Sequence, residues 1–282
     1  MKQIYNRIVI NKGKTLSNMI MFFLCFIILF SSIVINNLNV EIEKGKVTTI
    51  LGPNGSGKST LLSIFAGLNK PSSGDVTIKG KSIKSLKQKE LAQEIATVHQ
   101  QNTVPSDITV KELVYYGRIP RKKYFQGNSN EDEEIVEWAI KRTGLEKLKD
   151  KSVMSMSGGE RQRAFIAMAL AQKSEILFLD EPTTYLDIYH QVEILELVKE
   201  LNEESNLTVV MVLHDINQAI KYSDNIIVMK FGQAIASGKV NEVINMNLLN
   251  DVYKIGGFIS EIEKETIFVP LKLTNCQAKC NT

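Results

Sequence analysis

The sequence predicts an α/β fold with a mostly parallel sheet, and two observations support this prediction. Apolar runs of strand length alternate along the chain with segments of helical spacing, which is typical of strands joined by covering helices. A glycine-rich loop follows one of the apolar runs and opens a helix, as in sheets that bind phosphate groups at one edge. The chain has 282 residues, of which 44% are hydrophobic, so it can bury a core large enough for this fold.

Apolar runs rich in β-branched residues predict the strands, because such residues pack well in a buried sheet. The predicted strands cover residues 47–51, 76–78, 176–179, 208–213 and 225–229. Helical spacing between these runs predicts the covering helices. The predicted helices cover residues 59–67, 157–171, 189–201 and 217–222. We expect the strands to be parallel, since parallel neighbours need a crossover connection of this kind.

One long stretch between the second and third predicted strands is helical rather than alternating. Apolar residues recur at helical spacing from about Thr109 to Leu148, and a polar loop at 127–132 interrupts them. We interpret this stretch as a separate helical subdomain, at about 106–160, inserted into the α/β body.

The two ends of the chain differ from the body at 36–255. Residues Asn39–Glu43 alternate apolar and polar before a turn at 44–45, and we expect antiparallel strands on this N-terminal side of the sheet. Residues 1–35 form an atypical N-terminal segment, and residues 256–282 form a C-terminal extension.

Charge and cysteine content exclude some classes of protein. The formal net charge is only +3, and no basic stripe indicates a nucleic-acid partner. The basic cluster within 118–123 is interpreted as a solvated loop, with contact to an acidic partner as the alternative. Cys25, Cys276 and Cys280 do not make an extracellular disulfide framework. We interpret Cys276 and Cys280 as reduced thiols, because two ligands rarely hold a metal alone.

An uncharged apolar run, Met19–Ile35, is unusual for a chain of this kind. A positively charged stretch at 11–14 precedes it, as in membrane anchors and signal peptides. The run is at the short limit for a membrane-spanning helix. Three interpretations stay open: a membrane anchor, an altered reading frame at the start of the chain, and an apolar pair of strands.

The glycine-rich loop after the first predicted strand carries the sharpest chemical signal. It has the pattern G-x-x-x-x-G-K-S followed by threonine, formed by Gly52, Pro53, Asn54, Gly55, Ser56, Gly57, Lys58, Ser59 and Thr60. Glycine lets backbone N–H groups face phosphate oxygens, and the helix N-terminus adds partial positive charge. Lys58 would reach the β- and γ-phosphates, and the Ser59 hydroxyl would bind Mg²⁺. The alternative is a chance glycine turn, which the strand–loop–helix context argues against.

Two adjacent carboxylates, Asp180 and Glu181, follow the apolar run at 176–179. A strand that ends in two carboxylates places both at the carboxyl edge of the sheet, where ligands bind in such folds. We expect Asp180 to hold Mg²⁺ through water and Glu181 to activate a water molecule as general base. The alternative is a helix or turn cap, for which one aspartate is sufficient.

A third motif opens the alanine-rich helix and comprises Ser157, Gly158, Gly159 and Glu160. Alone, it is equally well explained as a helix N-cap. The order of the motifs is more specific: a phosphate loop, then Ser-Gly-Gly-Glu-Arg-Gln-Arg, then a strand ending in Asp-Glu, then a histidine after a strand. In this order the chain resembles ABC ATPases, the ATP-binding subunits of ABC transporters, from about Asn36 to Tyr253.

The resemblance implies roles for three more residues. Gln100 looks like the glutamine that contacts Mg²⁺ and senses the membrane partner. His214 resembles the switch histidine that contacts the γ-phosphate, whereas a lone histidine after a strand is otherwise a core or edge residue. Asp187 resembles the aspartate of the family's D-loop. ATP and Mg²⁺ are the implied ligands, and Glu181, His214 and Lys58 are the implied catalytic residues.

The resemblance also implies partners. Two copies pair head to tail, and Ser157 and Gly159 of one copy close over the ATP held by the other. Hydrolysis reopens this homodimer, and the motion passes to polytopic membrane permease subunits and indirectly to a substrate-binding protein. The implied location is the cytoplasmic face of the cell membrane, with peripheral attachment.

Several stretches are similar to the ATPases of iron–siderophore, haem and cobalamin importers. These stretches are 91–98, 106–118, 252–255 and 267–271. They imply an importer of iron complexes such as a siderophore, ferric citrate or haem. The alternatives are a soluble ABC ATPase of DNA repair or translation and an inactive nucleotide-binding remnant.

The sequence departs from the family at two places. Met156 precedes the Ser-Gly-Gly motif where leucine is common, a change of similar volume that we expect to be tolerated. The family's adenine-stacking aromatic lies before Asn36, where this chain has its apolar run. Neither Phe26 nor Phe30 is assigned to that role, and we expect low selectivity for ATP over GTP.

Overall fold

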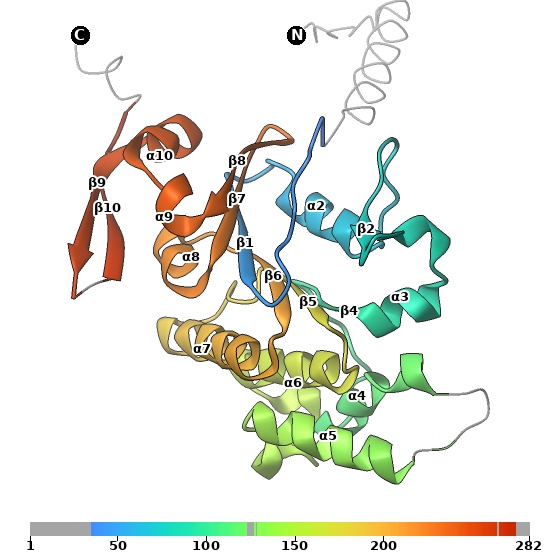
Figure 1. The fold of residues 1–282 in the computed structure, drawn as a ribbon. Helices are drawn as coiled ribbons and strands as arrows, with labels where there is room; N and C mark the ends of the chain where they lie inside the picture. The colour runs from blue at the N-terminus through green and yellow to red at the C-terminus, as the bar shows by residue number, and fades with distance from the viewer. Residues whose placement is uncertain (1–34, 123–126, 128, 264, 275–282) are drawn as a thin grey trace, which may run out of the picture.

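A computed structural model describes residues 35–122, 127, 129–263 and 265–274. Its main sheet has the strand order β4-β5-β6-β1-β7-β8 (Figure 1). The strands are β1 (Val47–Leu51), β4 (Ile95–Val98), β5 (Ile176–Asp180), β6 (Thr208–Val212), β7 (Asn225–Lys230) and β8 (Gln233–Lys239). Neighbours from β4 to β7 are parallel, and β8 pairs antiparallel with β7. The predicted α/β fold with a mostly parallel sheet is confirmed.

Helices cover both faces of this sheet. They are α2 (Lys58–Phe65), α3 (Gln88–Glu94), α6 (Gly158–Ala171), α7 (Ile188–Ser205) and α8 (Ile216–Tyr222). Along β6, Val209 and Met211 belong to the core that contains α6 and α7, whereas Val210 and Val212 belong to the core that contains α2. Since successive side chains of a strand point to opposite faces, a strand buried on both faces needs the continuous apolar run seen in the sequence.

The α7 helix begins at the residue after Asp187, whose carboxylate accepts a hydrogen bond from the His190 N–H at 2.9 Å. The α2 helix ends at Phe65, and Gly67 follows in the left-handed region with φ +70°, as helix ends favour. These boundaries agree with the predicted helices to within a few residues.

The predicted helical region contains several short elements beside α6. They are α4 (Val110–Tyr116), η2 (Ile119–Arg121), α5 (Asn130–Arg142), η3 (Glu146–Leu148) and η4 (Val153–Ser155). Both α4 and α5 pack against α6, in the lower part of Figure 1. A buried ion pair joins the segment between α4 and η2 to α5, because Arg118 Nε donates to Asp132 Oδ1 at 2.7 Å. Arg118 also donates to the carbonyl of Ala171 at the end of α6.

A small antiparallel hairpin lies in the N-terminal half, formed by β2 (Thr77–Ile78) and β3 (Lys81–Ser82) and followed by η1 (Ile83–Ser85). Residues Asn39–Glu43 form no strand with any described residue. Their alternation is nevertheless structural, because Val40 and Ile42 pack against the core that contains α2.

The C-terminal part of the body adds elements that the sequence analysis did not predict. They are α9 (Val240–Val243), α10 (Met246–Tyr253), β9 (Ile255–Ile262) and β10 (Glu265–Leu273). The antiparallel ribbon β9–β10 is fixed to α8, because Asn217 exchanges two hydrogen bonds with the backbone of Phe268, at 3.1 and 2.8 Å. The proposed C-terminal extension at 256–282 thus begins inside this ribbon.

Several sequence predictions fall outside the described residues. These are the apolar run up to residue 34, including Phe26 and Phe30, and the positions of Lys123, Cys25, Cys276 and Cys280. The three interpretations of this run therefore stay open, and the low ATP selectivity stays a prediction. Within the described ranges, none of the helices is both long and apolar enough to cross a bilayer.

Candidate functional site

The phosphate loop joins β1 to α2, as predicted. Gly52 has φ +150°, and a Cβ built there would lie 2.2 Å from the Met229 carbonyl oxygen and 2.7 Å from Ser56 Oγ. Gly57 precedes α2 with φ 100°, and no described side chain caps the helix start. The first N–H groups of α2 thus have no side-chain acceptor, which leaves them available to an anion.

Lys58 lies under the loop and is 5% exposed. Its Nζ donates to the carbonyls of Gly52 at 2.9 Å and Pro53 at 3.1 Å. Burial lowers the pKa of Lys58, while the nearby charges of Glu181 and Asp180 oppose this shift. Ser56 Oγ is buried and has no hydrogen-bond partner among the described residues. A buried cation and an unsatisfied hydroxyl fit a phosphate group at this loop.

Ser59 and Asp180 meet at the carboxyl edge of the sheet, although 121 positions separate them in the sequence. The Ser59 hydroxyl donates to Asp180 Oδ1 at 2.9 Å. Burial raises the pKa of Asp180, the Ser59 hydrogen bond lowers it, and the charge of Glu181 raises it. A carboxylate and a hydroxyl are oxygen ligands of the kind that Mg²⁺ prefers.

No cluster of three or more His, Cys, Asp or Glu side chains within the described ranges could hold a metal ion. Mg²⁺ in nucleotide sites is usually held by one or two protein oxygens together with phosphate oxygens and water, a set that Ser59 and Asp180 would fit.

Glu181 follows β5 with a left-handed backbone, φ +51°, and three side chains surround its carboxylate. Gln100 Nε2 donates to Oε2 at 2.6 Å, and Thr184 Oγ1 donates to the same oxygen at 3.0 Å. His214 Nε2 lies 2.7 Å from Oε1. The structure therefore brings together Gln100, Glu181 and His214, which the sequence analysis had assigned to one site.

These groups line one open cleft of about 510 Å³. Its lining residues are Asn54, Gly55, Gly57, Lys58, Ser59, Thr60, Gln100, Glu181, Thr184, Tyr185 and His214. Thr184 and Tyr185 line the cleft but are not among the site residues that the sequence predicts. A tight turn after Glu181 returns both residues to the strand end, but no residue type in the sequence indicates its left-handed backbone at Glu181 and Tyr185.

The Ser-Gly-Gly motif and Asp187 do not line this cleft. Ser157 is the N-cap of α6 and forms a capping box with Glu160: Ser157 N–H donates to Glu160 Oε2 at 2.9 Å, and Glu160 N–H to Ser157 Oγ at 3.3 Å. The backbone N–H of Ser157 lowers the pKa of Glu160. The N-cap interpretation is therefore correct within one copy of the chain.

Glycine at the third position of the motif has a local packing reason. A Cβ on Gly159 would lie 2.6 Å from the ring of His190, which is in the first turn of α7. The start of α6 and the start of α7 are thus in direct contact, so the exposed Gly158 and Asp187 lie on a neighbouring surface apart from the cleft, and Gly159 is buried at the contact.

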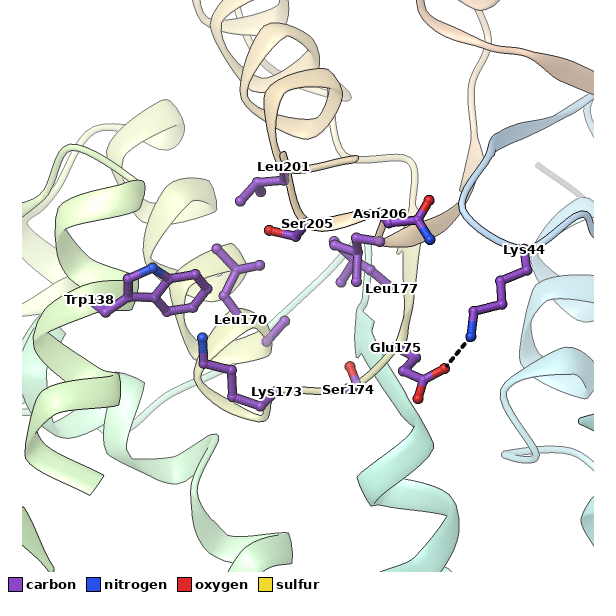
Figure 2. Close-up of a pocket in the computed structure, with 12 residues that line it drawn as sticks. Lys44, Trp138, Leu170, Lys173, Ser174, Glu175, Leu177, Leu201, Ser205 and Asn206 are labelled. Atoms are coloured by element: carbon purple, nitrogen blue, oxygen red, sulfur yellow. Dashed lines mark hydrogen bonds and ion pairs between the residues drawn. The ribbon is translucent and has the colours of Figure 1, made fainter. Parts of the chain in front are cut away.

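A second cavity, of about 310 Å³, lies at the opposite edge of the sheet (Figure 2). Its lining residues are Lys44, Trp138, Ala169, Leu170, Lys173, Ser174, Glu175, Leu177, Leu201, Ser205, Asn206 and Leu207. Lys173 Nζ lies 3.2 Å from the Trp138 ring centroid, and Lys44 pairs with Glu175 at 3.1 Å. This cavity has neither a glycine loop nor a helix N-terminus, so the phosphate-binding chemistry belongs to the cleft at the carboxyl edge.

Comparisons with known proteins agree with the geometry. A family model described as ABC transporter matches residues 35–184. The petrobactin import ATP-binding protein FpuC of Bacillus anthracis is 46% identical over 86% of this chain and 90% of its own length. The ferric enterobactin transport ATP-binding protein FepC of Escherichia coli is 44% identical over 86% of this chain and 90% of its own length. A solved dimer of the ATP-binding cassette MJ0796 with bound ADP and Pi has a TM-score of 0.64 at 36% identity, over 73% of this chain and 90% of that one.

Proposed function

The chain belongs to the ABC transporter family and is an ATPase, and from this premise we propose that it powers the import of iron complexes. A ferric siderophore, ferric citrate or haem is the cargo. The observation that carries the proposal is the similarity, over most of the chain, to ATP-binding proteins named for petrobactin import and ferric enterobactin transport. The intact cleft supports an active motor rather than an inactive remnant.

In the proposed reaction, the phosphate loop holds ATP through its backbone N–H groups and Lys58. Glu181 orients and deprotonates the attacking water, and the buried Lys58 ammonium stabilises the charge that develops on the γ-phosphate. His214, which lies 2.7 Å from Glu181 and lines the same cleft, contacts the γ-phosphate.

The proposed Mg²⁺ ligands are Ser59, Asp180 and, in the closed state, Gln100. When bound, Mg²⁺ neutralises phosphate charge and orients the leaving group. The hydrogen bond between Ser59 and Asp180 supports this assignment, since both oxygens already face one point beside the phosphate loop.

The proposed working unit is a homodimer with two equivalent sites. Ser157, Gly158, Gly159 and Glu160 of one copy, at the start of α6, close over the ATP in the cleft of the other, and Asp187 lies beside that contact. The solved dimer of a similar cassette supports this arrangement. So does the separation of the motif from the cleft in one copy, because the motif needs a second copy to reach a nucleotide.

The proposed partners are two polytopic permease subunits and, through them, a substrate-binding protein. The chain would attach to the permease at the cytoplasmic face of the membrane, where ATP is available. Gln100 is suited to couple the two proteins, because it is in contact with Glu181 and follows β4 at the edge of the sheet.

Uptake of radioactive iron tests the proposal. A strain that lacks the gene should lose uptake of one class of iron complex among ferric siderophores, ferric citrate and haem. The wild-type gene should restore that uptake, and a Glu181→Gln variant expressed at the same level should not. Normal uptake of all three classes in the deletion strain would contradict iron-complex import.

A further inference from the structure

The turn after β5 brings a hydroxyl back to the expected catalytic base. Glu181 and Tyr185 have left-handed backbones, with φ +51° and +66°, and the N–H of Thr184 donates to the Glu181 carbonyl at 3.2 Å. This tight turn places Thr184 Oγ1 3.0 Å from Glu181 Oε2. Left-handed backbone is uncommon outside glycine, so two such residues around one turn indicate that its geometry matters.

The other two side chains that contact the Glu181 carboxylate come from other parts of the chain. Gln100 follows β4 and His214 follows β6, and both are expected to contact the nucleotide or its Mg²⁺ when ATP is bound. A side chain that moves to the nucleotide cannot also hold Glu181. Thr184 lies in the same turn as Glu181 and therefore keeps its distance from the carboxylate when Gln100 and His214 move away.

We propose that Thr184 is a positioning residue for ATP hydrolysis, whose hydroxyl fixes the Glu181 carboxylate toward the attacking water. A carboxylate with one oxygen held by a hydroxyl keeps its second oxygen free for the water proton, which is the geometry a general base needs. The proposal rests on the ATPase activity and not on the identity of the transported complex.

The test compares Thr184→Val, which keeps the shape and removes the hydroxyl, with Thr184→Ser, which keeps the hydroxyl. Steady-state ATP hydrolysis and melting temperature are measured for both variants and for the wild type. Thr184→Val should lower kcat by about ten- to a hundredfold with KM for ATP within about twofold, from the usual strength of a hydrogen bond to a charged group. Thr184→Ser should restore kcat to within a few-fold of the wild type.

A double variant separates positioning from a structural effect. In the Glu181→Gln background, Thr184→Val should cause no further loss, because the group that it positions is already gone. Three results would overturn the proposal: wild-type kcat in Thr184→Val, an equal loss in the serine and valine variants, or a loss of kcat accompanied by a proportional rise in KM or a lowered melting temperature.

Discussion

His214 Nε2 lies 2.7 Å from Glu181 Oε1, although the two residues follow different strands. The parallel pairing of β5 and β6 explains the contact, because their register places Asp180 beside Val212. The next residues of both strands therefore leave the sheet at the same edge. Glu181 and His214 meet as a consequence of strand register.

Removal of the Lys58 ammonium should weaken nucleotide binding itself. Lys58→Ala deletes a buried charge next to the phosphates, where one hydrogen bond to a charged group contributes about 1.5–3 kcal/mol. Calorimetry with ATP should therefore show a loss of about ten- to a hundredfold in affinity. Lys44→Ala is the matched control, since Lys44 lies at the opposite edge of the sheet and is 70% exposed. Unchanged ATP affinity in Lys58→Ala would contradict the assignment of residues 52–60 as the phosphate-binding loop.

The affinity for Mg²⁺ should fall in mildly acidic solution. The raised pKa of Asp180, caused first by burial, means that its carboxyl takes up a proton at a higher pH than an ordinary aspartate. A proton on Asp180 removes the charge that helps to hold Mg²⁺, so the Mg²⁺ concentration for half-maximal hydrolysis should rise as the pH is lowered toward the raised pKa of Asp180. The charged groups that act on Asp180 are Glu181, His99 and Lys58.

Asp180→Glu is the informative variant for this pH effect. It keeps a carboxylate but moves it away from Ser59, so its pH dependence should differ from that of the wild type. A Mg²⁺ requirement in the wild type that stays constant down to about pH 4, near the ordinary pKa of an aspartate, would mean that Asp180 does not hold the ion.

The buried ion pair between Arg118 and Asp132 should matter for stability rather than for chemistry. Burial alone would raise the pKa of Asp132, but hydrogen bonds from Arg118 and Ser129 outweigh burial and lower it. Asp132→Asn leaves the Arg118 charge buried and unpaired, which should cost about 3–5 kcal/mol in the free energy of unfolding. Urea unfolding at pH 7 measures this loss.

The pH dependence of that loss has a definite sign. A carboxyl whose pKa is lowered in the folded state stabilises the fold at pH values above its pKa in the unfolded chain, which is about 4 for an aspartate. This stabilisation is lost as the pH falls through the lower pKa that Asp132 has in the folded protein. The difference between the wild type and Asp132→Asn should therefore shrink below about pH 4. Glu265→Gln is the control, because its pair with Lys221 is exposed and should contribute less than about 1 kcal/mol. A loss as small as that of the control would contradict the prediction.

Much of the fold could be predicted because its strands and caps leave local signals. β1 and β5 coincide with their apolar runs, and α6 begins at the residue after its predicted cap, Ser157. β4 was missed because α3 ends at Glu94 and the strand begins at Ile95 without an intervening loop. β8 was missed because it is an edge strand that alternates exposed and half-buried residues and contains glycine and polar residues.

The candidate site was predictable where glycine, lysine and carboxylates have fixed spacing, as from Gly52 to Ser59. The contact of Thr184 with Glu181 was not, because it depends on left-handed backbone at a glutamate, which no residue type indicates. The contact between Gly159 and His190 likewise depends on how α6 and α7 pack.

The most direct test of the account is ATP turnover by Glu181→Gln, with Glu175→Gln as a matched control at the opposite edge of the sheet. The amide keeps the shape of Glu181 but cannot accept the water proton. The account predicts that Glu181→Gln binds ATP with nearly wild-type affinity, loses turnover by at least about a hundredfold, and accumulates as an ATP-bound dimer in gel filtration. Glu175→Gln should behave as the wild type. Normal hydrolysis by Glu181→Gln would contradict the assignment of Glu181 as the base and, with it, the proposed arrangement of the site.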